Sequence, residues 1–139
     1  MIKPTDPGKC VETRTAWLWL RDDGILAQEV RPGVRQMLAD ARETIAAVAA
    51  IAKGQPRACM LDIRGGISVG PGVRELYFSP EGGRDLSALA ILVTSVMART
   101  TSNVVLALVR PIHPIRMFTE EERAVAWLQP FIHAVRAGG

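Results

Sequence analysis

Apolar and polar residues follow two different periods along the chain, and its first third shows both. Residues 13–20, Thr-Arg-Thr-Ala-Trp-Leu-Trp-Leu, are rich in strand formers, and residues 22–24, Asp-Asp-Gly, are a turn signal before a second strand-like run at 25–30. This pattern predicts a β-hairpin. From residue 34 to residue 52 the apolar positions recur every three or four residues, which predicts an amphipathic helix that ends near Lys53 and Gly54.

The rest of the chain repeats strand and helix in turn. Residues 57–63 and 86–94 are short apolar runs, typical of strands that are covered on both faces. A short helix is predicted at 71–78, and a longer one from Ser95 to about Val109. A last strand is predicted at 115–118. Residues 119–122, Thr-Glu-Glu-Glu, form a capping box before a final helix, which Pro130 is expected to kink or to end early. The order β-β-α-β-α-β-α-β-α predicts one α/β domain with a mixed sheet of about five strands, the last three of them parallel.

Length and composition favour a single domain. The 139 residues are 48% apolar, and the longest apolar runs are far too short to cross a membrane. Residues 1–12 are expected to be a flexible leader, and residues 13–137 the domain. The net charge is +3, with the basic residues spread singly, so a nucleic-acid partner is not expected. Cys10 and Cys59 form no disulfide framework, which favours a reducing, cytoplasmic setting.

Three stretches of core and capping residues share a pattern with a known fold. They are Met60-Leu-Asp-Ile-Arg64 with a helix ending in Leu76-Tyr-Phe78, Leu89-Ala-Ile-Leu-Val-Thr-Ser95, and Pro114-Ile-Arg-Met-Phe-Thr-Glu-Glu-Glu122 with Ala124-Val-Ala-Trp-Leu128. Over about residues 13–135 the chain resembles the SpoIIAA-like fold of anti-sigma-factor antagonist (STAS) domains, which is grouped with lipid-binding Sec14-type domains. More narrowly, it resembles small uncharacterised bacterial STAS/SEC14-like proteins.

The resemblance implies a regulatory or protein-interaction module, expected to be a homodimer. In STAS antagonists an Asp-Ser pair lies at the start of the helix after the middle strand, and a partner kinase phosphorylates the serine. The equivalent stretch here, residues 67–72, is Ile-Ser-Val-Gly-Pro-Gly and has no such pair. Ser68 lies nearby, shifted by a residue or more, and is a candidate phosphoacceptor.

The Gly-rich loop after the middle strand is the main candidate for a ligand or partner site. It leads into a helix N-terminus, where an anion can bind, and the hydroxyls at the end of the next strand are expected to face the same crevice. The alternative is structural: the glycines permit tight turns, the hydroxyls cap helices, and Asp62 bonds the next loop rather than acting as a buried acid with a raised pKa. The candidate residues are Asp62, Arg64, Gly65, Gly66, Ser68, Thr94 and Ser95.

Three further residues are candidates for binding. Trp17 and Trp19 share one strand face, either as core or as an interface with another subunit. His113 lies between two prolines, in a loop expected at the opposite edge of the sheet from Asp62.

No catalytic arrangement is recognisable, so neither enzyme activity nor a cofactor or metal is expected. The function predicted from the sequence is a STAS-like regulatory or protein-interaction module without evident catalysis. The alternative is a Sec14-like protein that binds a small apolar or anionic ligand or a lipid, because several apolar helices could part to form a pocket.

Overall fold

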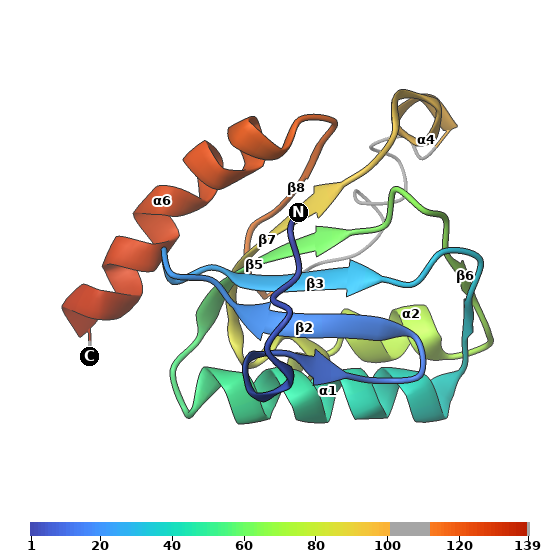
Figure 1. Cartoon of the computed structure of the whole chain (residues 1–139), viewed down its shortest axis with the longest axis horizontal. Coiled ribbons are helices and arrows are strands. Elements are labelled where there is room, and N and C mark those ends of the chain that lie inside the picture. Colours follow the sequence, from blue (N-terminus) through green and yellow to red (C-terminus); the bar gives the residue numbers. More distant parts are fainter. Residues whose placement is uncertain (101–111, 139) are drawn as a thin grey trace.

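One mixed sheet organises the molecule. The computed structural model describes residues 1–100 and 112–138. Within them six strands follow the order β1-β2-β3-β5-β7-β8 (Figure 1). Strands β1 (Val11–Glu12), β2 (Ala16–Leu20) and β3 (Leu26–Val30) are antiparallel neighbours, whereas β3, β5 (Arg57–Asp62), β7 (Leu86–Leu92) and β8 (Ile115–Phe118) are parallel. The predicted hairpin, mixed sheet and parallel last three strands are confirmed.

The first twelve residues supply the additional strand. We expected a flexible leader, but a 3₁₀ turn at η1 (Pro7–Lys9) leads into β1, which pairs Val11 with Leu18 of β2. The Asp6 carboxylate accepts a hydrogen bond from the Gly8 N–H at 3.0 Å and holds this turn. Part of the predicted leader therefore lies on the sheet. A two-residue strand is too short to show any period in the sequence.

The first long helix begins later than its apolar pattern suggests. We predicted a helix from residue 34, whereas α1 is Leu38–Ala52, and β4 (Arg35–Gln36) instead pairs in parallel with β6 (Ser68–Val69). The Met37 N–H donates to the Asp40 carboxylate at 2.8 Å, which satisfies a free donor at the start of the helix. The helix ends as predicted, with Lys53 in the left-handed region at φ 53°.

The shorter helices flank the middle of the sheet. They are α2 (Val73–Tyr77), α3 (Pro80–Gly83) and α4 (Ser95–Thr100). The part of the helix predicted beyond residue 100 lies outside the described residues. Helix α6 (Glu121–Gly138) continues through Pro130, so the proline does not end it. None of the helices in the described ranges combines the length and the apolar content that crossing a membrane requires.

The two faces of the sheet are covered differently. Strand side chains alternate between faces, and α6 covers one face while α1 covers the other (Figure 1). On the α6 side small and large apolar residues interlock in a fully buried core, where a buried Leu or Met contributes about 1.5–3 kcal/mol. This core is Ala58, Met60, Ala88, Ala90, Leu92, Ala124, Leu128 and Ile132, with Ile25.

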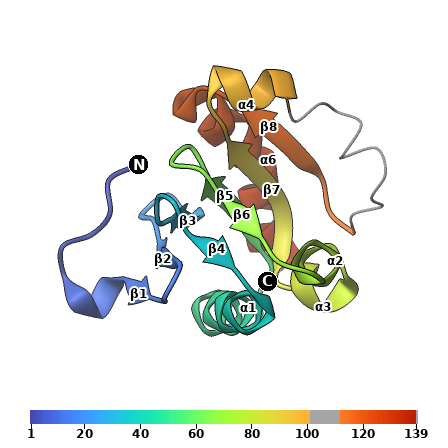
Figure 2. The same ribbon diagram turned by 90° about the vertical axis from the view of Figure 1, so that its right-hand side faces the viewer.

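The opposite face is less completely closed. Helix α1 packs on β2, β3 and the start of β5 through Ala47 and Val48, which contact Leu18, Leu26 and Cys59. Helices α2 and α3 lie beside α1 rather than over the strands (Figure 2). The apolar side chains of β5, β7 and β8 on this face therefore border a space that the described helices do not fill.

Candidate functional site

A cavity of about 400 Å³ lies on this face, between the strands and helices α1 and α2. Its volume falls in the range of small-molecule pockets. Alternate residues of the three parallel strands point into it, which is why their apolar runs supply a continuous wall. The wall residues on these three strands or directly after them are Cys59, Leu61, Ile63, Leu86, Leu89, Ile91, Val93, Ile115 and Met117.

A small polar cluster lines the helical side of the cavity. The Tyr77 hydroxyl of α2 donates to Gln36 Oε1 at 2.9 Å, and Gln36 Nε2 donates to Thr15 Oγ1 at 2.9 Å. Gln36 is only 1% exposed, so these two hydrogen bonds replace the ones that its amide would make with water in the unfolded chain. Burial raises the pKa of the Tyr77 phenol, and the polar groups of Thr44 and Gln36 beside it offset this only in part. Tyr77 is therefore a neutral hydrogen-bonding group.

Thr44 of α1 completes this cluster and is left unsatisfied. Its side chain is 2% exposed and lines the cavity, yet Oγ1 makes no hydrogen bond with any described group. The hydroxyl is near enough to Tyr77 to act on the phenol pKa, but outside hydrogen-bond distance or angle. A buried hydroxyl without a partner costs about 1–3 kcal/mol. Such an atom on a cavity wall is a place where a ligand group would be accommodated favourably.

Two ionisable side chains lie at other points of the wall. Arg74 of α2 is exposed and is the one charged residue among the described lining residues. It makes no ion pair with a described carboxylate. His113 is partly buried before β8, and burial lowers its pKa, opposed by the Pro114 carbonyl 3.3 Å from Nδ1. It precedes β8 whereas Asp62 ends the parallel β5, so the predicted placement at opposite edges is confirmed.

The loop predicted as the main site has a mostly structural arrangement. Asp62 is 6% exposed, and its carboxylate accepts hydrogen bonds from the Arg64 backbone N–H at 3.0 Å and from Arg64 Nε and Nη2 at 3.0 and 2.8 Å. Burial raises the Asp62 pKa, but the Arg64 hydrogen bonds and charge lower it further, so it lies below its ordinary value. The alternative of a buried acid with a raised pKa is wrong, because Arg64 neutralises the carboxylate.

The other predicted residues of the loop and the neighbouring strand end lie apart from the cavity. Ser68 is exposed in β6 and accepts from Arg35 Nη1 at 2.7 Å, and Gly72, not Ser68, precedes α2. Gly66 adopts φ +93°, a turn conformation that favours glycine. Gly65 packs closely on Pro32.

At the start of α4 the capping hydroxyl differs from the expected one. Thr94 Oγ1 accepts from the Met97 N–H at 3.1 Å, so Thr94 and not Ser95 provides the cap. Neither Thr94 nor Ser95, nor any of the loop candidates, lines either cavity described here. Whether these residues contact a partner stays a prediction.

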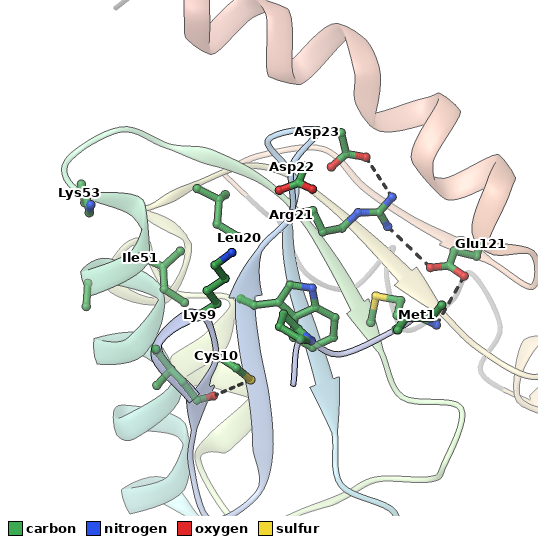
Figure 3. Close-up of a pocket in the computed structure, with 16 residues that line it drawn as sticks. Met1, Lys9, Cys10, Leu20, Arg21, Asp22, Asp23, Ile51, Lys53 and Glu121 are labelled. Carbon is green, nitrogen blue, oxygen red and sulfur yellow. Dashed lines mark hydrogen bonds and ion pairs between the residues drawn. The ribbon is translucent and has the colours of Figure 1, made fainter. Parts of the chain in front are cut away.

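A larger, wide-mouthed hollow of about 1070 Å³ lies beside β2 and the N-terminal segment. Figure 3 shows Arg21 on its rim, extended between Asp23 and Glu121. Arg21 pairs with both carboxylates, at 2.9 and 3.6 Å, whereas Lys9, Asp22 and Lys53 of the same hollow make no ion pair with a described residue. Trp19 lines the hollow but is only 4% exposed. In contrast with the smaller cavity, this hollow has no buried unpartnered side-chain atom among the described residues.

The two tryptophans predicted to share a face do so, with different surroundings. Trp19 belongs to the core. Trp17 is partly buried between two cations, with Lys3 Nζ 4.0 Å and the Arg31 guanidinium carbon 4.3 Å from the ring centroid. Arg31 is itself held by an ion pair with Glu12. An interface through Trp17 stays a prediction.

The polar groups of the cavity were not singled out from the sequence, although one signal was present. Thr44 occupies a position on the buried stripe of α1, three residues after Ala41 and four before Val48. A polar residue on an apolar stripe is a recognisable irregularity. Gln36 and Tyr77 come from segments far apart in the chain, and no local pattern links them. No group of three or more metal-ligating side chains occurs within residues 1–100 and 112–138.

The arrangement of the sheet and its helices defines a SpoIIAA-like fold. The structure is similar to the crystal structure of an uncharacterised protein of the DUF3478 family with a SpoIIAA-like fold from Shewanella loihica PV-4, with a TM-score of 0.57 and 13% identity over 86% of this chain and 90% of that one. Residues 18–132 match the domain of unknown function DUF7793, and the chain belongs to that family. No curated protein matches it. At this identity the structural likeness establishes the fold and leaves the function to be argued from the site.

Proposed function

We propose that this protein binds a small, mainly apolar ligand in the cavity between β5, β7, β8 and helices α1 and α2. The observation that carries the proposal is the buried, unpartnered hydroxyl of Thr44 on the wall of a mainly apolar space. On β5, β7 and the edge strand β8, the side chains of Leu61, Leu89 and Met117 are only partly buried. A ligand that covers them gains about 25 cal/mol for each Å² of apolar surface removed from water.

We propose binding rather than catalysis. Three ionisable groups of the described wall are neutral near pH 7: the Tyr77 phenol and the Cys59 thiol, whose pKa values burial raises, and the His113 imidazole, whose pKa burial lowers. The fourth, Arg74, keeps its positive charge and serves as a hydrogen-bond donor only. Tyr77 donates its hydrogen bond to an amide, and His113 faces a backbone carbonyl. Neither bond joins a nucleophile to a base, as covalent catalysis requires. The free thiols of Cys10 and Cys59 support a reducing, cytoplasmic setting.

Native and denaturing mass spectrometry of the purified protein test the proposal first. Extra mass in the native spectrum that disappears on denaturation supports a bound ligand. Binding is then measured with the neutral apolar dye Nile red. Leu61→Trp fills the cavity and is expected to abolish dye binding, whereas Leu20→Trp makes the same change on β2, away from this cavity, and should leave it intact. Equal binding by both variants would contradict the proposal.

Self-association is the second candidate, in line with the protein-interaction module expected from the sequence. Large apolar side chains are exposed around the wide hollow: Ile2 is 95% exposed, Leu20 43% and Val11 38%. Val11 lies on the short edge strand β1, and unpaired strand edges invite pairing with another copy. Sedimentation velocity at increasing concentration tests this candidate. A dimer that dissociates in the Val11→Lys variant supports it, and a monomer at all concentrations refutes it. A regulatory role rests on the fold alone.

A further inference from the structure

The charge distribution around the cavity narrows the class of ligand. This step rests on the proposed function and uses a different observation, the position of Arg74. Among the described lining residues all others are apolar or neutral, so an occupant meets a single positive charge and no negative one. Asp40, the carboxylate whose charge adds to the raised pKa of Tyr77, is bound by Arg14 Nε and Nη2 at 2.7 and 2.6 Å.

Arg74 belongs to the same side of the cavity as the polar cluster. It precedes Tyr77 by three residues in α2, and side chains at this spacing lie on one side of a helix. Tyr77 in turn contacts Gln36 and influences Thr44 across the cavity wall. Apart from Gln28 of β3, the strand side of the described wall is apolar. The cavity therefore has a polar, positively charged side and an apolar side, which matches a ligand with one anionic end.

We infer that the ligand is an aliphatic monocarboxylate whose carboxylate binds Arg74 and whose tail lies along β5, β7 and β8. The planar guanidinium offers paired donors that fit both carboxylate oxygens. The neutral hydroxyls of Thr44 and Tyr77 can donate to an oxygen without adding charge. A phosphate carries a charge of about −1.5 to −2 and would exceed what one arginine neutralises. A neutral alcohol would make no charge-assisted contact with Arg74.

Competition against bound Nile red tests the ligand class with dodecanoate, dodecan-1-ol and dodecyl phosphate, the two anions below their critical micelle concentrations and the alcohol below its solubility limit. The charge-assisted contact, weakened by the exposure of Arg74, is expected to favour dodecanoate over the alcohol about tenfold. Shortening the carboxylate should lower its affinity by about fourfold for each methylene removed from the cavity. Arg74→Gln should remove the preference for the carboxylate and leave alcohol binding unchanged.

A matched control separates the local contact from the general charge of the protein. Arg42 is an exposed arginine of α1 that does not line the cavity, and Arg42→Gln should retain the preference for dodecanoate. Equal binding of dodecanoate and alcohol, or tighter binding of dodecyl phosphate, would overturn the inference while leaving an apolar ligand in place. Failure of the dye and of all three competitors to bind would overturn the proposed function itself.

Discussion

Two buried threonines, Thr44 and Thr15, allow a direct test of whether the Thr44 hydroxyl lacks a hydrogen-bond partner. Thr44 Oγ1 has no hydrogen-bond partner among the described residues, whereas Thr15 Oγ1 accepts from Gln36 Nε2 at 2.9 Å. Both side chains are almost fully buried, at 2% and 0% exposure. Replacement by valine removes one hydroxyl in each case and keeps the branched shape. The two changes therefore differ mainly in what the hydroxyl was bonded to.

The expected effects on stability have opposite signs. Thr44→Val removes a hydroxyl that costs about 1–3 kcal/mol to bury without a partner, so we expect the free energy of unfolding to rise by about 1 kcal/mol. For a chain of this length that corresponds to a melting temperature about 4 °C higher. Thr15→Val leaves the Gln36 amide without its acceptor and should lower the free energy of unfolding by about 1–3 kcal/mol. Threonine and valine have similar helix propensity, so α1 itself is not a confounding factor.

Urea denaturation followed by circular dichroism measures both values. The protein is first unfolded and refolded from denaturant so that any copurified ligand is removed, because a ligand would stabilise the native state. Thr44→Val should also weaken dodecanoate binding by about fivefold, since one hydrogen bond of about 1 kcal/mol is lost. A loss of stability in Thr44→Val as large as that in Thr15→Val would refute the reasoning. It would show that the Thr44 hydroxyl has a partner in solution.

Three further predictions address the surroundings of the site. Arg14 lowers the pKa of Asp40 to about 2, so Asp40→Asn should lose about 1 kcal/mol of stability above pH 4, after allowance for the exposure of Arg14, and the difference should vanish as the pH falls to about 2 in urea titrations. Gly82→Ala places a Cβ 2.2 Å from the Leu76 carbonyl oxygen, so it should lower the free energy of unfolding by about 1–3 kcal/mol and weaken Nile red binding. Burial raises the pKa of Cys59 to about 12, so iodoacetamide at pH 8 should modify it only after unfolding, as counted by mass spectrometry.

Each of these has a comparison within the same chain. Asp22 is exposed and has no ion pair with a described residue, so Asp22→Asn should leave the free energy of unfolding almost unchanged. In Gly8→Ala the new Cβ meets only the Asp6 side chain at 3.5 Å, and the variant should stay stable. Cys10 is partly exposed and should react in the folded protein. A Cys59 that reacts as fast as Cys10 would contradict the burial argument.

Most of the fold could be predicted because its signals are local. The Asp-Asp-Gly turn, the apolar runs of β5 and β7 and the left-handed stop at Lys53 each depend on neighbouring residues alone. The start of α1 could not be predicted in this way. Residues 34–37 continue the apolar period of the helix, but residues 35 and 36 pair with β6, thirty-three positions further on. A local pattern of apolar residues holds no information about a partner strand so far away in the sequence.

The same distinction explains why the loop after β5 was favoured over the cavity. Parallel sheets commonly bind ligands at the carboxyl ends of their strands, and a glycine-rich loop follows β5 at that edge. In the structure, however, Asp62 and Arg64 satisfy each other through three hydrogen bonds. Because Asp62 and Arg64 are only two positions apart, their opposite charges can pair regardless of the path of the loop that follows. The sequence shows both residues but not that each is the partner of the other.

A group identifies this site when it is unsatisfied and also lies on a cavity wall; Ser87 Oγ is likewise buried without a partner among the described residues, but it lines neither cavity. The sequence shows Thr44 on the buried stripe of α1. Its hydroxyl lacks a partner only because of the positions that Tyr77 of α2 and Gln36 of β4 take in the folded chain. Arg74 is one of many exposed arginines in the sequence, and only the fold shows that it borders an apolar space. The free hydroxyl of Thr44 and the charge of Arg74 lie on one side of the cavity, and both favour the polar end of a ligand there. The apolar side chains of the strands opposite would stabilise its apolar tail. The site thus depends on what the folded chain leaves unpaired, a property of the tertiary structure that no single segment encodes.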